Sequence, residues 1–284
     1  LNQGAMSPPP APEQYLKYEK ACKYLEENVF SKDKFVRDND NEKEKEMVIT
    51  RLVSDQPGQA NITDPHLVNA WGLAFNPTGT FWVADNGADV ATLYNGGFDS
   101  VPIATVPLVV TIPDGKPSGQ VFNPTQGFKV GPDDNKHPAL FIFSAESGDI
   151  IGWSPLVPPT TAAQLAASVP GAIFKGLAIG EIDSHPFLYA TDFHQGNVVV
   201  FDENFDIVQL PNSFQDPNLP SGYAPVGIQV FDDAVYVTYA VQDEDAEDDV
   251  AGAGHGIVSV FDLQGVFRRR IATHGELISP WGMM

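Results

Sequence analysis

One stretch of the chain decides the fold: Phe187-Leu188-Tyr189-Ala190-Thr191-Asp192-Phe193-His194-Gln195-Gly196-Asn197-Val198-Val199-Val200-Phe201-Asp202. Two apolar runs rich in β-branched and aromatic residues flank a short polar turn that contains Gly196, and this pattern predicts a β-hairpin. Similar pairs of apolar runs occur at 81–95, 140–153 and 235–262, the last around a long acidic loop. The chain is therefore expected to repeat one β-structural unit.

Each hairpin follows a short apolar segment that opens with glycine, and a fifth such glycine stands near the end of the sequence: Gly72, Gly127, Gly176, Gly227 and Gly282. A period close to 50 residues, with strands and no convincing helix in each unit, favours a β-propeller. A fourth strand is predicted at 106–112, 206–210 and 266–272, and is poorly marked in the second unit. A two-sheet sandwich is the alternative, since it also uses many short strands.

The predicted propeller is incomplete. Four units and one further strand fall short of the blades that most propellers contain. Residues 47–53 predict another strand, expected to close a later blade by pairing with chain from the C-terminal end. The fold class is thus an all-β propeller of four-stranded blades, which is expected to be truncated and which self-association could complete.

Two regions differ in composition. Residues 1–47 form a Pro-rich and charged extension with a predicted helix at 13–30, and residues 48–284 form the propeller. The helix would present one apolar stripe, which is expected to dock on the domain rather than on a partner; it comprises Tyr15, Tyr18, Cys22, Leu25 and Val29. A short helix is also possible at 160–168.

The composition excludes several classes of function. Nearly all of the formal net charge of −21 lies in residues 48–284, so nucleic acids and anionic membrane surfaces are not expected partners. Cys22 is the only cysteine, which rules out an intrachain disulfide and a cysteine-based zinc site. No apolar run approaches the length of a membrane span. Asn61-Ile62-Thr63 is the only usable glycosylation sequon.

Many separate phrases of residues 50–284 resemble a family of secreted, uncharacterised bacterial and fungal proteins. The matching phrases are 52–55, 63–65, 67–74, 81–87, 92–96, 175–178, 190–194, 216–220, 222–225, 248–254 and 279–282. The resemblance implies an NHL-like propeller with six blades when complete, an extracellular location and no established activity. The chain departs from the family by ending at Met284, where the family continues with further blades.

Strands of a meander alternate in direction, so the loop entering each first strand and the turn after each second strand lie at the same end. Ligands of propellers are expected at this face, around the central channel. The predicted ligand-face residues are His66, Asn69, Asp85, Asn86, Glu146, Lys175, Asp192, His194 and Tyr223, with Thr125 and Ser279 at the equivalent connections.

Two groups of carboxylates on this face could hold calcium. Asp85, Glu146 and Asp192 follow the second strand of three successive units, and oxygen ligands converging on the axis suit Ca²⁺. The simpler interpretation is that each caps its own turn by accepting backbone N–H hydrogen bonds. The acidic loop 243–249 offers a second calcium site, with candidate ligands Asp243, Asp245, Asp248 and Asp249, although it lacks the EF-hand pattern. A solvated loop is the alternative.

Two functions follow from these features. The first is an extracellular, non-enzymatic binding or scaffold propeller for a small molecule, glycan or protein, with calcium as a candidate stabiliser. The second is a calcium-dependent hydrolase resembling propeller lactonases, with His194 and Asp192 as catalytic candidates. No nucleophile elbow, zinc-protease motif or phosphate loop accompanies them, so structural roles for His66 and His194 are the simpler interpretation.

Overall fold

A computed structural model describes residues 50–76, 79–97, 101–210, 214–273 and 275–283. The predicted helix at 13–30 and the rest of the extension lie outside these residues, as do residues 47–49 of the strand predicted at 47–53. Within the part of the chain that the structure describes, no helix is both long and apolar enough to cross a membrane.

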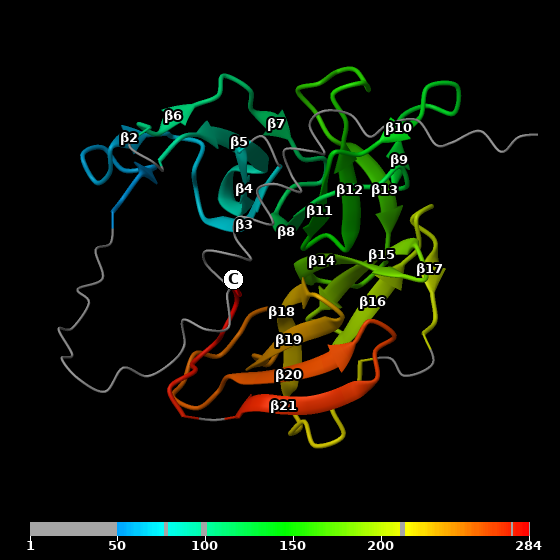
Figure 1. The fold of residues 1–284 in the computed structure, drawn as a ribbon. Helices are drawn as coiled ribbons and strands as arrows, with labels where there is room; N and C mark the ends of the chain where they lie inside the picture. Colours follow the sequence, from blue (N-terminus) through cyan, green and yellow to red (C-terminus); the bar gives the residue numbers. More distant parts are fainter. Residues whose placement is uncertain (1–49, 77–78, 98–100, 211–213, 274, 284) are drawn as a thin grey trace, which may run out of the picture.

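Four antiparallel sheets follow one another along the chain and form an arc around a common centre (Figure 1). Blade one contains β3 (Ala70–Phe75), β4 (Phe81–Asp85), β5 (Val90–Asn95), β6 (Ala104–Thr105) and β7 (Val110–Thr111), with a 3-10 turn, η2 (Asn86–Ala88), between β4 and β5. Blade two contains β8 (Pro117–Phe122), β11 (Phe141–Ala145), β12 (Asp149–Trp153) and β13 (Gln164–Ser168).

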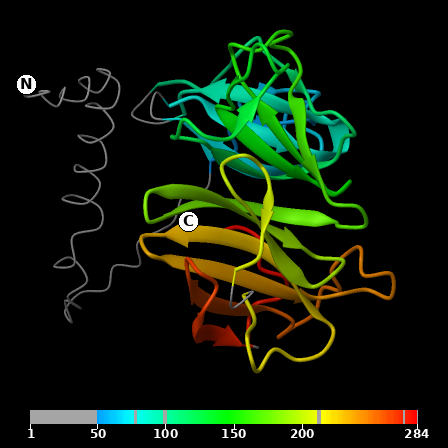
Figure 2. The same ribbon diagram turned by 90° about the vertical axis from the view of Figure 1, so that its right-hand side faces the viewer.

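Blade three contains β14 (Phe174–Ile182), β15 (His185–Asp192), β16 (Asn197–Phe201) and β17 (Ile207–Val208), and blade four contains β18 (Tyr223–Phe231), β19 (Ala234–Val241), β20 (Ile257–Asp262) and β21 (Phe267–Thr273). Two small sheets lie outside the blades: β1 (Val53–Ser54) pairs in parallel with β2 (Ile62–Thr63), and β9 (Lys129–Val130) pairs with β10 (His137–Pro138). From the side, blades one and two lie together at the top, with blade three below them and blade four at the bottom (Figure 2). The predicted β-propeller architecture is confirmed.

The structure corrects three predicted elements. The first strand of blade two is β8, not the segment that opens at Gly127; residues 129–130 form the peripheral strand β9. The helix predicted at 160–168 is instead the outer strand β13, which supplies the missing fourth strand of blade two. Of the strand predicted at 47–53, the described part contributes only Val53, and this residue pairs with Ile62 rather than with the C-terminal end.

The core lies between the blades, as the repeat requires. Trp82 of blade one stacks on Phe141 of blade two with 4.3 Å between ring centroids, and Tyr189 of blade three packs in the same core cluster as Phe261 of blade four. Each meander therefore buries apolar surface against its neighbour, which no single blade could do alone.

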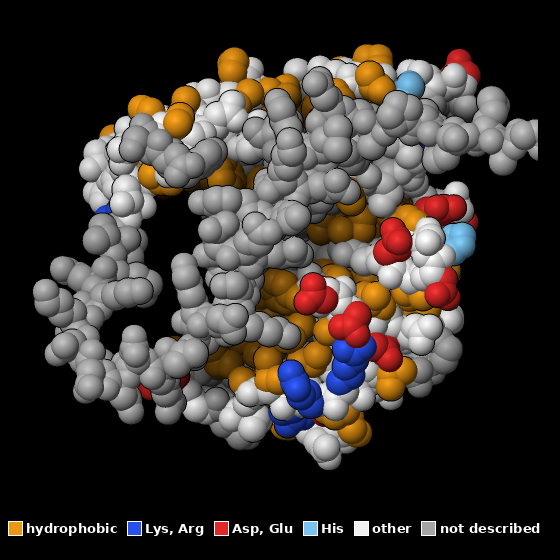
Figure 3. Space-filling model, in the orientation of Figure 1, with side chains coloured by type: hydrophobic (Ala, Val, Ile, Leu, Met, Phe, Trp, Pro, Cys, Tyr) orange, Lys and Arg blue, Asp and Glu red, His pale blue; other side chains and the backbone are white. Residues whose placement is uncertain are grey.

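The basic run 268–270 lies on β21, the outermost strand of blade four, where Arg268 pairs with Asp233 at 2.8 Å. Figure 3 shows the basic side chains visible on this face next to acidic ones.

Glycine recurs where the first strands meet at the centre. A Cβ added to Gly72 would lie 2.7 Å from the Ser118 carbonyl oxygen, and one at Gly176 would lie 2.7 Å from the Val226 carbonyl oxygen. At Gly119 it would overlap the Leu177 backbone nitrogen. The repeated glycine thus allows neighbouring backbones to approach closely.

Replacing Gly119 by alanine is expected to lower the free energy of unfolding by about 2 to 3 kcal/mol, because the new methyl group must displace a strand backbone. Gly282→Ala is the matched control, since an added Cβ there meets nothing within 4 Å. Urea unfolding of both variants measures the difference. Equal stabilities would contradict the close-approach role of Gly119.

Candidate functional site

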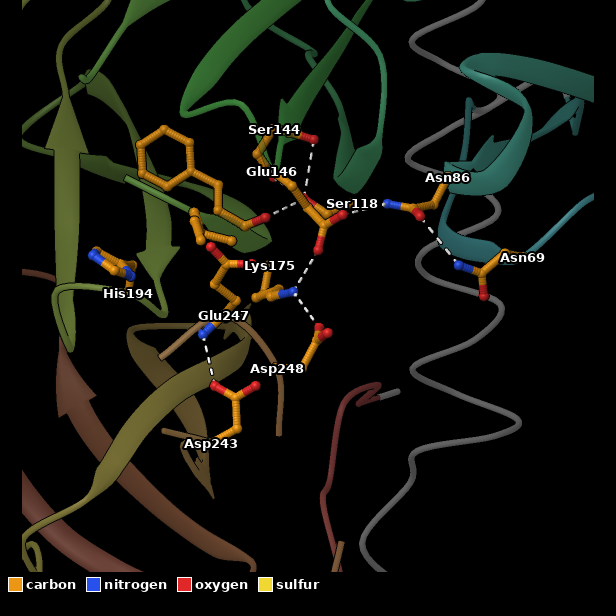
Figure 4. Close-up of polar contacts among 12 residues, drawn as sticks. Asn69, Asn86, Ser118, Ser144, Glu146, Lys175, His194, Asp243, Glu247 and Asp248 are labelled. Atoms are coloured by element: carbon orange, nitrogen blue, oxygen red, sulfur yellow. Dashed lines mark hydrogen bonds and ion pairs between the residues drawn. The ribbon is translucent and has the colours of Figure 1, made fainter. Parts of the chain in front are cut away.

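A chain of polar side chains crosses the face predicted to bind ligands (Figure 4). The Asn69 amide donates to the Asn86 side-chain oxygen at 3.1 Å, and the Asn86 amide donates to Glu146 Oε2 at 3.3 Å. Lys175 continues the chain by pairing with Glu146 Oε1 and with Asp248 Oδ1, the latter at 3.3 Å. These residues come from four successive blades, and we call them the polar belt: Asn69, Asn86, Glu146, Lys175 and Asp248.

Lys175 is the centre of the belt. Its side chain is 1% exposed, and its ammonium group lies 5.1 Å from the ring centroid of Trp71 and 5.9 Å from that of Trp281. The rings of Trp71 and Trp281 contact each other edge to face, with 4.5 Å between centroids. A buried cation paired with a carboxylate and surrounded by aromatic faces is held by both ion pairing and cation–π attraction.

A β-bulge places Lys175 in this position. Phe174 pairs with Asp192 and Gly176 pairs with Thr191, so Lys175 is an extra residue on β14 without a partner on β15. Bulges bend a strand and redirect the side chain at that point. The backbone of β14 therefore sends the lysine to the centre of the face.

The belt borders a hollow of about 430 Å³ at the mouth of the channel, which we call the mouth hollow. Its lining combines one indole, amides, carboxylates and a lysine: Asn69, Trp71, Asn86, Asp114, Lys116, Glu146, Ser147, Ile173, Glu247 and Asp248. Sequence reasoning identified Asn69, Asn86 and Glu146 as ligand-face residues but missed Trp71, Asp114 and Lys116. The position of Trp71 directly before a repeat glycine, equivalent to Lys175 and Trp281, was the available signal.

Asp85, Glu146 and Asp192 do not converge. The strand register makes Asp85, Ala145 and Asp192 equivalent, because they pair with Ala70, Pro117 and Phe174 of the respective first strands. Glu146 is one residue further on, and side chains alternate between the two faces of a strand. Asp85 and Asp192 are buried, whereas Glu146 belongs to the belt. The prediction that the three occupy equivalent positions is therefore wrong, and an axial calcium site built from them does not fit.

Asp192 caps its own turn. Its Oδ1 accepts hydrogen bonds from the backbone N–H groups of Ile173 and Gln195, both at 3.1 Å. Burial raises the pKa of Asp192 above its usual value, and these backbone hydrogen bonds oppose the shift. The Nδ1 atom of the exposed His194 lies 3.2 Å from the Ala246 carbonyl oxygen, and His194 donates this bond when the nitrogen carries a proton. Neither residue lines the mouth hollow.

The remaining predicted residues lie outside the polar belt. His66 pairs with Asp64 at 3.2 Å, and the Tyr223 hydroxyl donates to the Gly254 carbonyl at 3.5 Å. The Thr125 hydroxyl donates to Asn123 at 2.7 Å and lies beside β9, so it is not at the connection into the first strand of blade two. The Ser279 hydroxyl is buried and has no hydrogen-bond partner among the described residues.

The acidic loop folds toward the channel mouth. Asp243 accepts a hydrogen bond from the Glu247 N–H at 2.9 Å, and Asp248 extends from the loop to Lys175. Among the described residues, no group of three or more His, Cys, Asp or Glu side chains is arranged to hold a metal ion. A calcium site involving Asp243, Asp245, Asp248 and Asp249 thus stays a prediction.

No family model matches the chain. Two proteins of Acanthamoeba polyphaga mimivirus, both described as uncharacterised, are 30% identical over 247 residues and 29% identical over 249 residues. The matches cover 83% of this chain in both cases, and 60% and 64% of the viral proteins. The chain therefore spans a little under two thirds of the length of the curated relatives it matches.

Similar solved structures are β-propeller proteins. A chain of a nidogen/laminin complex has a TM-score of 0.42 and 13% identity over 72% of this chain and 63% of its own. Virginiamycin B lyase from Staphylococcus aureus has a TM-score of 0.38 and 15% identity over 68% and 77%, respectively. A gluconolactonase from Xanthomonas campestris has a TM-score of 0.36 and 14% identity over 52% and 48%.

Proposed function

We propose that this chain is a non-enzymatic binding propeller whose ligand occupies the mouth hollow. The supporting observation is the polar belt, which brings side chains from four blades together beside the indole of Trp71. Its members are fixed by one another before any ligand arrives, and a pre-organised site loses less entropy on binding. The volume of about 430 Å³ lies in the range of small-molecule sites.

The lining favours a neutral, hydroxyl-rich ligand such as a glycan. Asp114, Lys116 and Glu247 at the rim are exposed, and they offer both donors and acceptors to hydroxyl groups. The carboxylates in the lining and the strongly acidic domain repel anionic ligands. The indole of Trp71 supplies an apolar surface of the kind that aromatic residues provide in binding sites.

An extracellular location belongs to the same proposal. Asn61, the acceptor of the sequon, is exposed and therefore open to glycosylation in a secreted protein. Calcium remains a proposed stabiliser of the acidic loop. If it binds there, thermal melts in calcium and in chelator should differ, and Asp245→Asn should reduce that difference.

The hydrolase alternative has less support from the site. Asp85 and Asp192 are buried within blades one and three, and neither lines the mouth hollow. Turnover of a lactone such as dihydrocoumarin that disappears in Asp192→Asn would favour the hydrolase over the binding protein.

The binding proposal is tested by calorimetric titration with chitotriose and cellotriose, two neutral oligosaccharides. Glu247→Ala is expected to weaken the affinity about tenfold, because a charge-assisted hydrogen bond to the sugar is lost. Glu244→Ala is the matched control, since Glu244 lies on the same exposed loop but does not line the hollow. If neither sugar binds the wild-type protein, the glycan assignment is wrong.

A further inference from the structure

The face of blade one that points away from blade two carries exposed apolar side chains. Ala74 of β3 and its partner Trp82 belong to the core cluster shared with blade two. Side chains alternate along a strand, so Leu73 and Phe75 point to the opposite face. Leu73 is 57% exposed and Phe75 is 60% exposed, values that only Leu156 matches among the described large apolar residues. Their partners on β4 are apolar too, and the four residues form what we call the open patch: Leu73, Phe75, Phe81 and Val83.

The rest of this face is already covered by the chain that precedes blade one. Tyr94 of β5 pairs with Phe81 across the sheet, and its hydroxyl donates to Asp64 at 2.8 Å. Tyr94 is only 3% exposed, so the face is covered over β5 but left open over β3. Neighbouring apolar side chains that are exposed together mark an interaction surface, whereas single exposed residues are ordinary.

The chain enters the described structure at the edge of the open patch. Thr50, the first described residue, lines a hollow of about 610 Å³ together with Val83. Residues 1–49 are therefore attached directly beside the patch. Attachment of this kind gives a segment an effective concentration of roughly millimolar at nearby surfaces, which favours it over a free partner.

The sequence of residues 13–30 matches what an exposed apolar sheet face requires. These residues lie outside the described part of the chain, and their helix is predicted from the spacing of one apolar stripe: Tyr15, Tyr18, Cys22, Leu25 and Val29. A helix over this range would be about 27 Å long, and β3, with six residues, is about 20 Å long. A helix that covers one face of a sheet is a standard arrangement of two layers.

We propose that residues 13–30 dock as an amphipathic helix on the open patch of blade one, with the apolar stripe against Leu73 and Phe75. The segment then covers blade one on the side where the described chain supplies no further blade. A second copy of the chain is the competing occupant, and it would bind only between molecules. The proposal does not depend on the glycan-binding function, because no residue of the open patch lines the mouth hollow.

Cys22 serves as a probe of the docked position, because it lies in the stripe and is the only cysteine of the chain. In Phe75→Cys, mild oxidation with diamide is expected to join Cys22 to the introduced thiol within one chain. A disulfide requires the two Cβ atoms to come within about 4.5 Å of each other. Mass spectrometry of the digested protein measures the rate at which this disulfide forms.

Val101→Cys is the matched control for attachment alone. Val101 is 53% exposed and lies outside the open patch. It is also near the start of the described chain, since its carbonyl accepts a hydrogen bond from Gly97 at 2.8 Å and Gly97 lies beside Leu52. Nearness to the attachment point therefore acts on both variants, and the disulfide should form about tenfold faster in Phe75→Cys because only this site lies under the docked stripe.

Labelling of Cys22 with a maleimide tests the docking without a crosslink. A buried thiol reacts slowly, so the double variant Leu73→Asp with Phe75→Asp should speed labelling about fivefold by removing the apolar contact. Ile207→Asp should leave the rate unchanged, since Ile207 is 50% exposed but lies on β17 of blade three.

Three results would each overturn the proposal. The first is an equal rate of disulfide formation in Phe75→Cys and Val101→Cys. The second is a disulfide that forms only between chains, which would identify a second copy as the occupant of the open patch. The third is a labelling rate of Cys22 that the two aspartates leave unchanged.

Discussion

Replacing Lys175 by methionine is expected to lower the free energy of unfolding by about 3 to 5 kcal/mol, the cost of removing one partner of a buried ion pair. The Lys175 side chain is 1% exposed, and that of Glu146 is 15% exposed. Without the ammonium group, the Glu146 carboxylate loses its cation, and the aromatic rings of Trp71 and Trp281 lose the charge they surround. Urea unfolding at neutral pH measures this change.

Two further variants identify which contact is responsible. The double variant Lys175→Met with Glu146→Gln should recover most of the loss, because no buried charge then stays unpaired. Asp248→Asn should change stability by less than about 1 kcal/mol, since the Asp248 side chain is 77% exposed and surface pairs are screened by water. A Lys175→Met protein within about 1 kcal/mol of wild type would show that the belt does not stabilise the blades.

The same experiment bears on function. Because Lys175 holds Glu146, and Glu146 holds Asn86, the ammonium group orients residues on two blades that border the mouth hollow. Lys175 is thus a positioning residue in the binding proposal. Glycan affinity should fall in Lys175→Met under conditions where the variant is still folded.

The fold could be predicted from the sequence because the repeat is visible in most units. The prediction of the first strand failed in blade two for a physical reason. The first strand of that blade packs against neighbours on both sides, so it uses the small residues Ser118 and Gly119 and lacks an apolar run. The segment at 127–130 has the expected glycine and apolar residues but forms a peripheral strand.

The site was predicted only in part, because strand position alone does not say where a side chain points. Asn69, Asn86, Glu146 and Lys175 were placed on one face, and the structure joins them in the belt. Asp85 and Asp192 were placed with them, but a shift of one residue along a strand moves a side chain to the other face. The contact between Lys175 and Asp248 links residues 73 apart in the chain, and no local pattern predicts such a pairing.

Asp85 is expected to make the protein less stable as the pH rises from about 4 to 7. The Asp85 side chain is 0% exposed, and Thr92 of the neighbouring strand β5 lies beside its carboxylate. Burial raises the pKa of Asp85 to about 7; hydrogen bonding by Thr92 opposes this shift, and the charge of Asp64 adds to it. Below pH 3.8 the carboxyl is protonated in both the folded and the unfolded chain, so it contributes no pH dependence.

Between pH 3.8 and about pH 7, Asp85 is ionised in the unfolded chain but keeps its proton in the folded chain. Unfolding then releases a proton, so stability falls with rising pH until the cost levels off above pH 7 at about 4 kcal/mol. Asp85→Asn removes this ionisation. The free energy of unfolding of Asp85→Asn relative to wild type should therefore rise by about 3 kcal/mol between pH 4.5 and pH 8, as measured by urea unfolding at both pH values.

The comparison of variant with wild type isolates Asp85 from other carboxylates. The pKa values of Asp64 and Asp216 are lowered. The stability that these two carboxylates contribute is therefore lost in the opposite direction, as the pH falls. The contribution of Asp216 is common to both proteins and cancels in the difference, whereas that of Asp64, whose charge acts on Asp85, cancels only in part. Asp183→Asn, at an exposed turn, is the matched control and should run parallel to wild type. If Asp85→Asn also runs parallel to wild type, Asp85 is hydrated or paired in solution and its pKa is not raised.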